Sequence, residues 1–114
     1  MFEAKIQVEI VKYLIPLRRQ GLLEFFSVPN EAAGNPIRQG QMIAMGLRPG
    51  VSDMVLLFPG GKAAFMEVKN ETGKQREAQK QFQQMCISFC FPYRIVRSVS
   101  EARTYVESLL GGLI

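Results

Sequence analysis

Three side chains in this sequence have the types and spacing needed for metal-assisted chemistry. Asp53 is the only aspartate, and it stands directly before the most hydrophobic segment, residues 54–58. A carboxylate beside a buried strand is costly unless something compensates it. In the next apolar segment, the period-two alternation of a strand places Glu67 and Lys69 on one face. Two carboxylates suit a hard divalent cation such as Mg²⁺, and an adjacent lysine can hold, orient or deprotonate a water aimed at a phosphodiester.

The Glu-x-Lys spacing alone is weak evidence, because it also occurs by chance. Glu3 and Lys5 form a second match, but they lie on a predicted helix, where residues two apart point in different directions. The alternative interpretation of Glu67 and Lys69 is an exposed strand face with a cross-strand salt bridge. The surrounding elements must decide between the two.

The composition excludes several other chemistries. The chain has 114 residues and no histidine, which excludes Ser–His and Cys–His nucleophiles and histidine-bound zinc. Cys86 and Cys90 lack partner ligands, and we expect both to be reduced, buried apolar residues. We expect one domain over residues 1–114, with no membrane segment and a cytoplasmic location in a bacterial cell or phage-infected host.

Apolar periodicity and breaker residues divide the chain into alternating elements. We predict helices over 3–19 and 75–90, the second with a capping box at Thr72 and Gln75, and a last helix capped by Ser100 and ended by Gly111-Gly112. Strands are predicted over 22–28, 54–58, 63–69 and 93–97, the second of them buried on both faces. A loop over 31–50 contains a short helical turn near 39–45.

This order predicts an α/β fold, a small mixed β-sheet flanked by helices in the order α-β-loop-β-β-α-β-α. A βαβ crossover joins the third and fourth strands. Aromatic residues at core spacing are assigned to the core and not to base stacking: Phe25, Phe26, Phe82, Phe89 and Tyr105.

The motifs, taken in order, resemble one nuclease family. They are Gly46-x-x-x-Gly50-x-Ser52-Asp53, Glu67-Val68-Lys69, Gly73-Lys74 and Gln79, with supporting matches at Glu3-x-x-x-Gln7, Val28-Pro29-Asn30 and Ile95-Val96-Arg97-Ser98. The pattern is similar to the virus-type replication-repair nuclease domain (VRR-NUC) of the PD-(D/E)xK superfamily. Ser52 departs from the proline of the superfamily name. The resemblance implies a restriction-endonuclease-like core.

The resemblance also implies a role for each matched residue. Asp53 and Glu67 would be metal ligands for Mg²⁺ or Mn²⁺, with the Val68 carbonyl as a third. Lys69 would position and activate the attacking water. Glu3 would approach the metal directly or through water, and Gln79 would line the site.

The implied activity is a metal-dependent DNA endonuclease that acts on four-way (Holliday) junctions as a homodimer, since two symmetric cuts need two sites. The alternatives are a flap or less selective endonuclease, and a non-catalytic DNA-binding module. No nucleotide cofactor is expected. The net charge is +4, and the basic residues around the site could contact phosphates or merely solubilise the protein. The candidates are Arg38, Arg48, Lys62, Lys74, Arg76 and Lys80, of which Lys74 matches the family's Gly-Lys.

Overall fold

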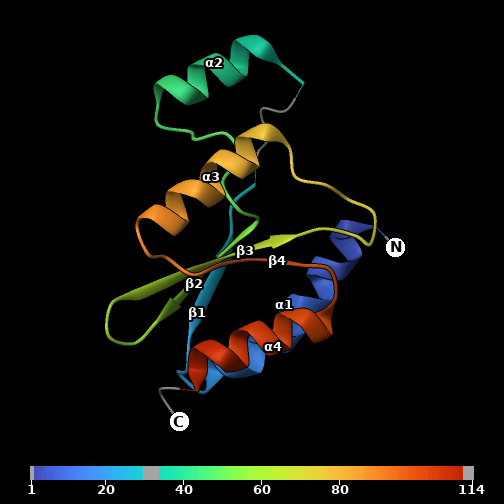
Figure 1. The fold of residues 1–114 in the computed structure, drawn as a ribbon, viewed down its shortest axis with the longest axis vertical. Helices are drawn as coiled ribbons and strands as arrows, with labels where there is room; N and C mark the ends of the chain where they lie inside the picture. Colours follow the sequence, from blue (N-terminus) through green and yellow to red (C-terminus); the bar gives the residue numbers. More distant parts are fainter. Residues whose placement is uncertain (1, 30–33, 112–114) are drawn as a thin grey trace.

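The computed structural model describes residues 2–29 and 34–111, which form four helices and four strands (Figure 1). In chain order these are α1 (Glu3–Arg19), β1 (Glu24–Ser27), α2 (Pro36–Ala44), β2 (Met54–Phe58), β3 (Lys62–Val68), α3 (Glu77–Ser88), β4 (Tyr93–Val96) and α4 (Val99–Leu110). None of the described helices is long and apolar enough to cross a membrane.

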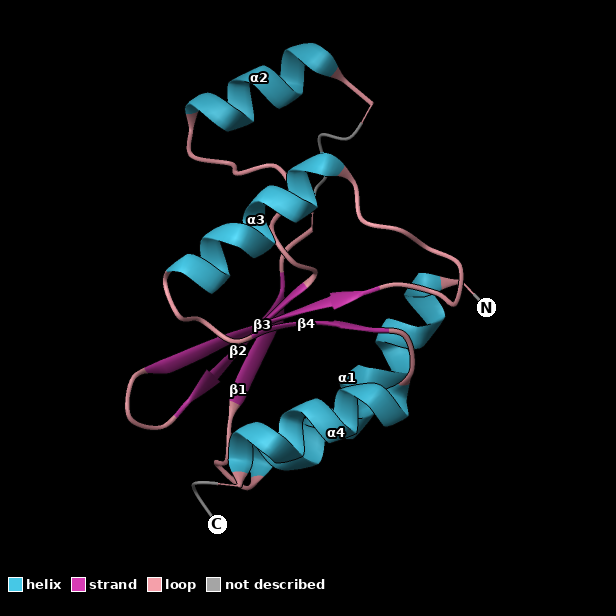
Figure 2. Cartoon of the chain, viewed as in Figure 1, coloured by secondary structure: helices cyan, strands magenta, loops and turns pink. Residues whose placement is uncertain are grey.

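The strands form one mixed sheet in the order β1-β2-β3-β4 (Figure 2). The β1–β2 and β2–β3 pairs are antiparallel, and β4 runs parallel to β3. Gly60 and Gly61 have positive φ angles in the tight turn between β2 and β3, where residues without a Cβ are favoured. The predicted α/β fold and its βαβ crossover through α3 are confirmed.

Helices cover the two faces of the sheet unequally. α1 and α4 pack against each other and against one face, where the main core lies, and α3 lies on the opposite face (Figure 1). Ile10 and Leu14 of α1, Met66 of β3 and Val106 of α4 are fully buried in this core. On the other face, the Phe82 ring of α3 meets the Phe65 ring of β3 edge-on, with 5.3 Å between the ring centroids.

Two aromatic residues predicted for the core are exposed. Because α3 lies over β4 and β3, the β1–β2 half of this face of the sheet is uncovered. Phe26 of β1 is therefore 48% exposed and Leu57 of β2 is 40% exposed, so β2 is fully buried on one face only. Phe89 lies beyond the last turn of α3 and is 66% exposed. Phe25, Phe82 and Tyr105 are buried, as predicted.

The predicted loop over 31–50 contains a nine-residue helix, longer than the expected turn. Asn35 caps α2, its side-chain oxygen accepting a hydrogen bond from the Arg38 N–H at 3.1 Å, and Pro36 occupies the first helical position. No residue of α2 is buried, and in the described chain α2 packs against no other helix or strand. Figure 1 shows it beyond α3, away from the sheet.

The predicted helix ends are partly wrong. α3 begins at Glu77, so Thr72 and Gln75 do not form its capping box. α4 is capped by Ser98 instead of Ser100, the Ser98 hydroxyl oxygen accepting from the Glu101 N–H at 3.1 Å. Cys86 is buried, but Cys90 follows α3 with a φ of 64° and is exposed. Gly112, the second residue of the predicted last stop, lies outside the described residues.

Candidate active site

The sheet register brings Asp53 opposite Glu67. Met54 pairs with Met66 in the antiparallel β2–β3 ladder, so the next pair outward is Asp53 with Glu67. Residues directly opposite each other in such a ladder have side chains on the same face. The Asp53 carboxylate Oδ2 accepts a hydrogen bond from the Val68 N–H at 2.7 Å, which fixes it at the end of β3.

Glu67 is a buried carboxylic acid without a partner. It is 1% exposed, and neither of its carboxylate oxygens accepts a hydrogen bond within the described chain. Burial and the neighbouring Asp53 carboxylate raise the pKa of Glu67 well above its ordinary value, and Lys69 and Arg76 oppose the shift more weakly. Buried polar groups are almost always hydrogen-bonded, so this unpartnered pair of oxygens indicates a missing positive ligand or proton.

The residues at this point fit a hard divalent cation. Two carboxylates face each other, and both oxygens of one are free. In an extended strand the N–H and C=O of one residue face the same neighbouring strand, so the Val68 carbonyl faces the side where Val68 donates to Asp53. Oxygen donors of this kind are those that Mg²⁺ and Mn²⁺ prefer. No third Asp, Glu or Cys gathers with them among residues 2–29 and 34–111.

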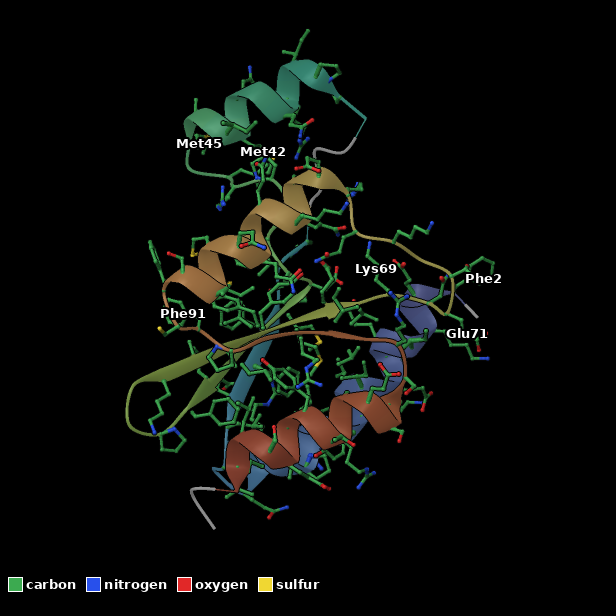
Figure 3. All side chains as sticks on the ribbon, in the orientation of Figure 1. Phe2, Met42, Met45, Lys69, Glu71 and Phe91 are labelled. Atoms are coloured by element: carbon green, nitrogen blue, oxygen red, sulfur yellow. The ribbon has the colours of Figure 1, made fainter. Side chains whose placement is uncertain are left out.

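Lys69 lies next to this pair at the end of β3 (Figure 3). Its backbone N–H donates to the Val96 carbonyl at 3.0 Å, which continues the β3–β4 pairing by one residue. The residue is only 8% exposed, and no ion pair involving its ammonium group is found in the described part of the chain. A buried lysine without a salt bridge is unusual in a purely structural position.

Glu3 reaches the neighbourhood from the first turn of α1. Its Oε1 lies 3.0 Å from the point where a Cβ on Gly73 would stand, and the Cδ of Lys69 lies 3.4 Å from the same point. Glu3 is therefore beside the Lys69 stem and does not form one compact ligand group with Asp53 and Glu67. The expectation that Glu3 approaches the metal, directly or through water, stays a prediction.

Gln79 is 5% exposed and lines a cleft of about 300 Å³ together with Asp53. Its Oε1 accepts a hydrogen bond from the Arg76 N–H at 2.8 Å at the start of α3. The cleft is also lined by Val28 and Pro29, which belong to a supporting match of the sequence. Three further lining residues were not selected by the sequence patterns: Ser27, Leu47 and Val51. Apolar and small residues of this kind carry no chemical signature in a sequence.

Comparison with known proteins places the chain in a family. The model of the VRR-NUC domain matches residues 9–100. The chain belongs to the VRR-NUC family. This membership implies a nuclease-type function in DNA processing. Glu3 lies outside the matched residues, whereas Asp53, Glu67 and Lys69 lie inside them.

Two solved structures share the fold of this VRR-NUC domain. One, titled "VRR_NUC domain", has 18% sequence identity and a TM-score of 0.65, with 92% of this chain and 94% of that chain covered. The other, titled "VRR_NUC domain protein", has 11% identity and a TM-score of 0.74, with 97% of this chain and 89% of that chain covered. No curated protein matches the chain.

The six basic residues named as candidates for phosphate contact are not equivalent in the VRR-NUC domain. Arg48 and Arg76 line the cleft beside Asp53, and the Arg48 guanidinium carbon lies 5.7 Å from the centre of the Phe82 ring. Arg38 lines a separate hollow on α2. Lys74 is exposed on the segment between β3 and α3 and does not line the cleft. The position of Arg48 and Arg76 makes them the better candidates for a phosphate close to the site.

Gly50 lets the segment before Asp53 lie directly against α3. Its φ is +85°, and a Cβ added there would overlap the Ala78 carbonyl group and the Gln79 nitrogen. We expect Gly50→Ala to lower the free energy of unfolding by about 1–3 kcal/mol, through backbone strain and displacement of α3. Urea denaturation measures this, with Gly40→Ala as the control, because a Cβ on Gly40 meets nothing within 4 Å. Equal stability of the two variants would contradict the packing described.

Proposed function

We propose that this VRR-NUC domain is a metal-dependent DNA endonuclease that hydrolyses phosphodiester bonds. The observation that carries the proposal is the carboxylate pair Asp53 and Glu67, in which Glu67 is buried with both oxygens unpartnered. A protein that gains nothing from such a group would not retain it, because an unpaired buried polar group destabilises the fold. The two unpaired oxygens of Glu67 face the Asp53 carboxylate, and two facing carboxylates favour a cation between them.

Each residue of the site has a separate task. Asp53, Glu67 and the Val68 carbonyl would hold Mg²⁺ or Mn²⁺. The chemistry supplied by the bound cation would be Lewis-acid polarisation of the scissile phosphate. Lys69 holds and orients the attacking water through its ammonium group, and Glu3 would approach the metal from α1, directly or through water. Gln79 shapes the wall of the cleft, and Arg48 and Arg76 bind the phosphate backbone.

The proposed substrate is a four-way DNA junction, cut by a homodimer. One chain contains one such carboxylate pair, and paired cuts across a junction need two. Ile37 of α2 and Met45, which directly follows α2, are 78% and 86% exposed, and Figure 3 shows Met42 and Met45 at this outlying helix. Large exposed apolar side chains on one element are typical of surfaces that associate with protein, which supports assembly of two copies.

The test is a cleavage panel of four-way junction, flap and linear duplex, each with Mg²⁺, Mn²⁺ or EDTA. We expect metal-dependent cutting, fastest on the junction, and a dimer mass in sedimentation. Asp53→Asn should abolish cutting but retain DNA binding, since an asparagine oxygen can still accept from the Val68 N–H. Glu107→Gln, an exposed position on α4, is the matched control. Binding without cutting under any metal would favour the non-catalytic module, and preferential flap cutting would favour the flap endonuclease.

A further inference from the structure

The chain makes a tight turn directly after Lys69, over residues 70–73. The Gly73 N–H donates to the Asn70 carbonyl at 3.3 Å, and the Thr72 N–H donates to the Asn70 side-chain oxygen at 3.2 Å. These hydrogen bonds define the shape of the turn. They do not attach it to the sheet, because the last backbone hydrogen bond from β3 to β4 is made one residue earlier, by Lys69.

Arg97 attaches this turn to the other end of the crossover. Its Nη1 donates to the Asn70 carbonyl at 2.7 Å and to the Gly73 carbonyl at 2.8 Å. Hydrogen bonds from a charged donor are stronger than those between neutral groups. Arg97 takes part in no ion pair within the described chain, so its guanidinium is directed at the backbone of the turn. Its own N–H donates to the Glu101 carboxylate at 3.0 Å, which ties it to the first turn of α4.

The 70–73 turn lies beside two residues of the proposed site, Glu3 and Lys69. Gly73 leaves room for both side chains, since a Cβ there would stand 3.0 Å from Glu3 Oε1 and 3.4 Å from Lys69 Cδ. In Figure 3, Lys69 and Glu71 lie on the same side of the molecule as Phe2, where α1 begins. The Lys69 stem lies beside this turn at Gly73, and no ion pair holds its ammonium group in the described chain.

We propose that Arg97 is a positioning residue, which holds the 70–73 turn so that Lys69 is fixed beside Asp53 and Glu67. The inference rests on the proposed nuclease function. Arg97 does not touch the carboxylates or the cleft, so its effect passes through the turn. Its loss leaves DNA and metal binding in place but frees the lysine, which lowers the rate of the chemical step. Small displacements of a reacting group cost large factors in rate.

The first experiment compares Arg97→Met with Arg103→Met in single-turnover cleavage of the junction. Arg103 is exposed on α4 and contacts the Tyr13 ring of α1. Because it does not belong to the 70–73 turn or bond to it, Arg103→Met controls for the loss of one arginine. Arg97→Met should lower kcat about 10- to 100-fold with KM and the DNA Kd within twofold of wild type. Arg97→Lys should recover part of the loss, because an ammonium group can still donate to two carbonyls.

The second experiment needs neither metal nor cleavage. Hydrogen exchange of the metal-free protein should show faster exchange of the Lys69 and Gly73 amides in Arg97→Met, with Met66 in β3 unchanged. If Arg97→Met does not fold, Arg97→Lys carries the test, because an ammonium group lacks the planar guanidinium and should still give an intermediate kcat and faster exchange of the Gly73 amide.

The outcomes separate this inference from the proposed function. Wild-type kcat together with wild-type exchange, in Arg97→Met or, if that variant does not fold, in Arg97→Lys, would overturn the positioning role. A parallel loss of kcat, DNA affinity and Tm would also overturn it, because that is the result of a general structural role. If the wild type cuts no DNA with any metal, the nuclease proposal fails, and the exchange rates alone decide whether Arg97 holds the turn.

Discussion

Lys69→Met is expected to reduce the single-turnover rate of DNA cleavage by about 10²- to 10⁴-fold, the usual contribution of a proton-transferring or water-orienting side chain. Methionine keeps the length and most of the volume of the apolar stem, which is packed against the 70–73 turn. It removes only the ammonium group. Because that group is not in an ion pair in the described chain, its removal should leave the free energy of unfolding within about 1 kcal/mol of wild type.

The decisive comparison for Lys69 is between turnover and metal binding. The rise in Tm on adding Mg²⁺ should be the same in Lys69→Met and wild type, since the metal is held by carboxylates. Lys12→Met, an exposed lysine on α1, controls for lost charge and should cleave DNA at close to the wild-type rate. Loss of the Mg²⁺-dependent rise in Tm in Lys69→Met would contradict the water-positioning role.

Glu67→Gln is expected to abolish cleavage and, at the same time, to make the metal-free protein more stable by about 1–3 kcal/mol at pH 7.5. Glutamine has nearly the same shape as glutamate but never carries a negative charge. The folded wild type must either take up a proton on Glu67 or hold an unpartnered buried carboxylate, and glutamine avoids both costs. Urea unfolding with and without Mg²⁺ measures both effects, because Mg²⁺ should stabilise wild type and have little effect on the variant.

The stability gain of Glu67→Gln should depend on pH with a definite sign. Burial and the Asp53 charge raise the pKa of Glu67 in the folded state, so between the unfolded and folded pKa values the folded protein binds more protons than the unfolded chain. Wild-type stability must then fall as the pH rises through this window, by at most about 1.4 kcal/mol per pH unit. The gain should grow from pH 5 to pH 8. A stability gain of Glu67→Gln that shrinks as the pH rises, or that equals the gain of Glu107→Gln, would contradict a raised pKa of Glu67 in the folded state.

The sequence was sufficient for the fold and for the pairing at the site. The alternation in 63–69 placed Glu67 and Lys69 on one face, and the two-glycine turn between 54–58 and 63–69 sets the antiparallel register that brings Asp53 opposite Glu67. The βαβ crossover followed from the apolar stripe between the third and fourth strands. In these places local pattern and tertiary packing agree.

The sequence was insufficient where tertiary contacts or single hydrogen bonds decide. Phe26 and Phe89 have core-type side chains, but their exposure depends on how far α3 extends over the sheet, which no local pattern encodes. Gly40 suggested a loop, yet the Asn35 cap and Pro36 start a helix through it. The role of Arg97 was invisible for a different reason. It acts on backbone carbonyls 24 and 27 residues away in the chain, and backbone groups leave no trace in side-chain spacing.

The hydrogen bond from the Val68 N–H to the Asp53 side chain has a consequence for mutational studies of this domain. At this position a carboxylate replaces the backbone carbonyl that would otherwise continue the ladder between β2 and β3. Alanine scanning at residue 53 would therefore remove a rung of the sheet together with a negative charge, and an inactive alanine variant could not be attributed to chemistry. Asparagine preserves the acceptor and separates the two contributions.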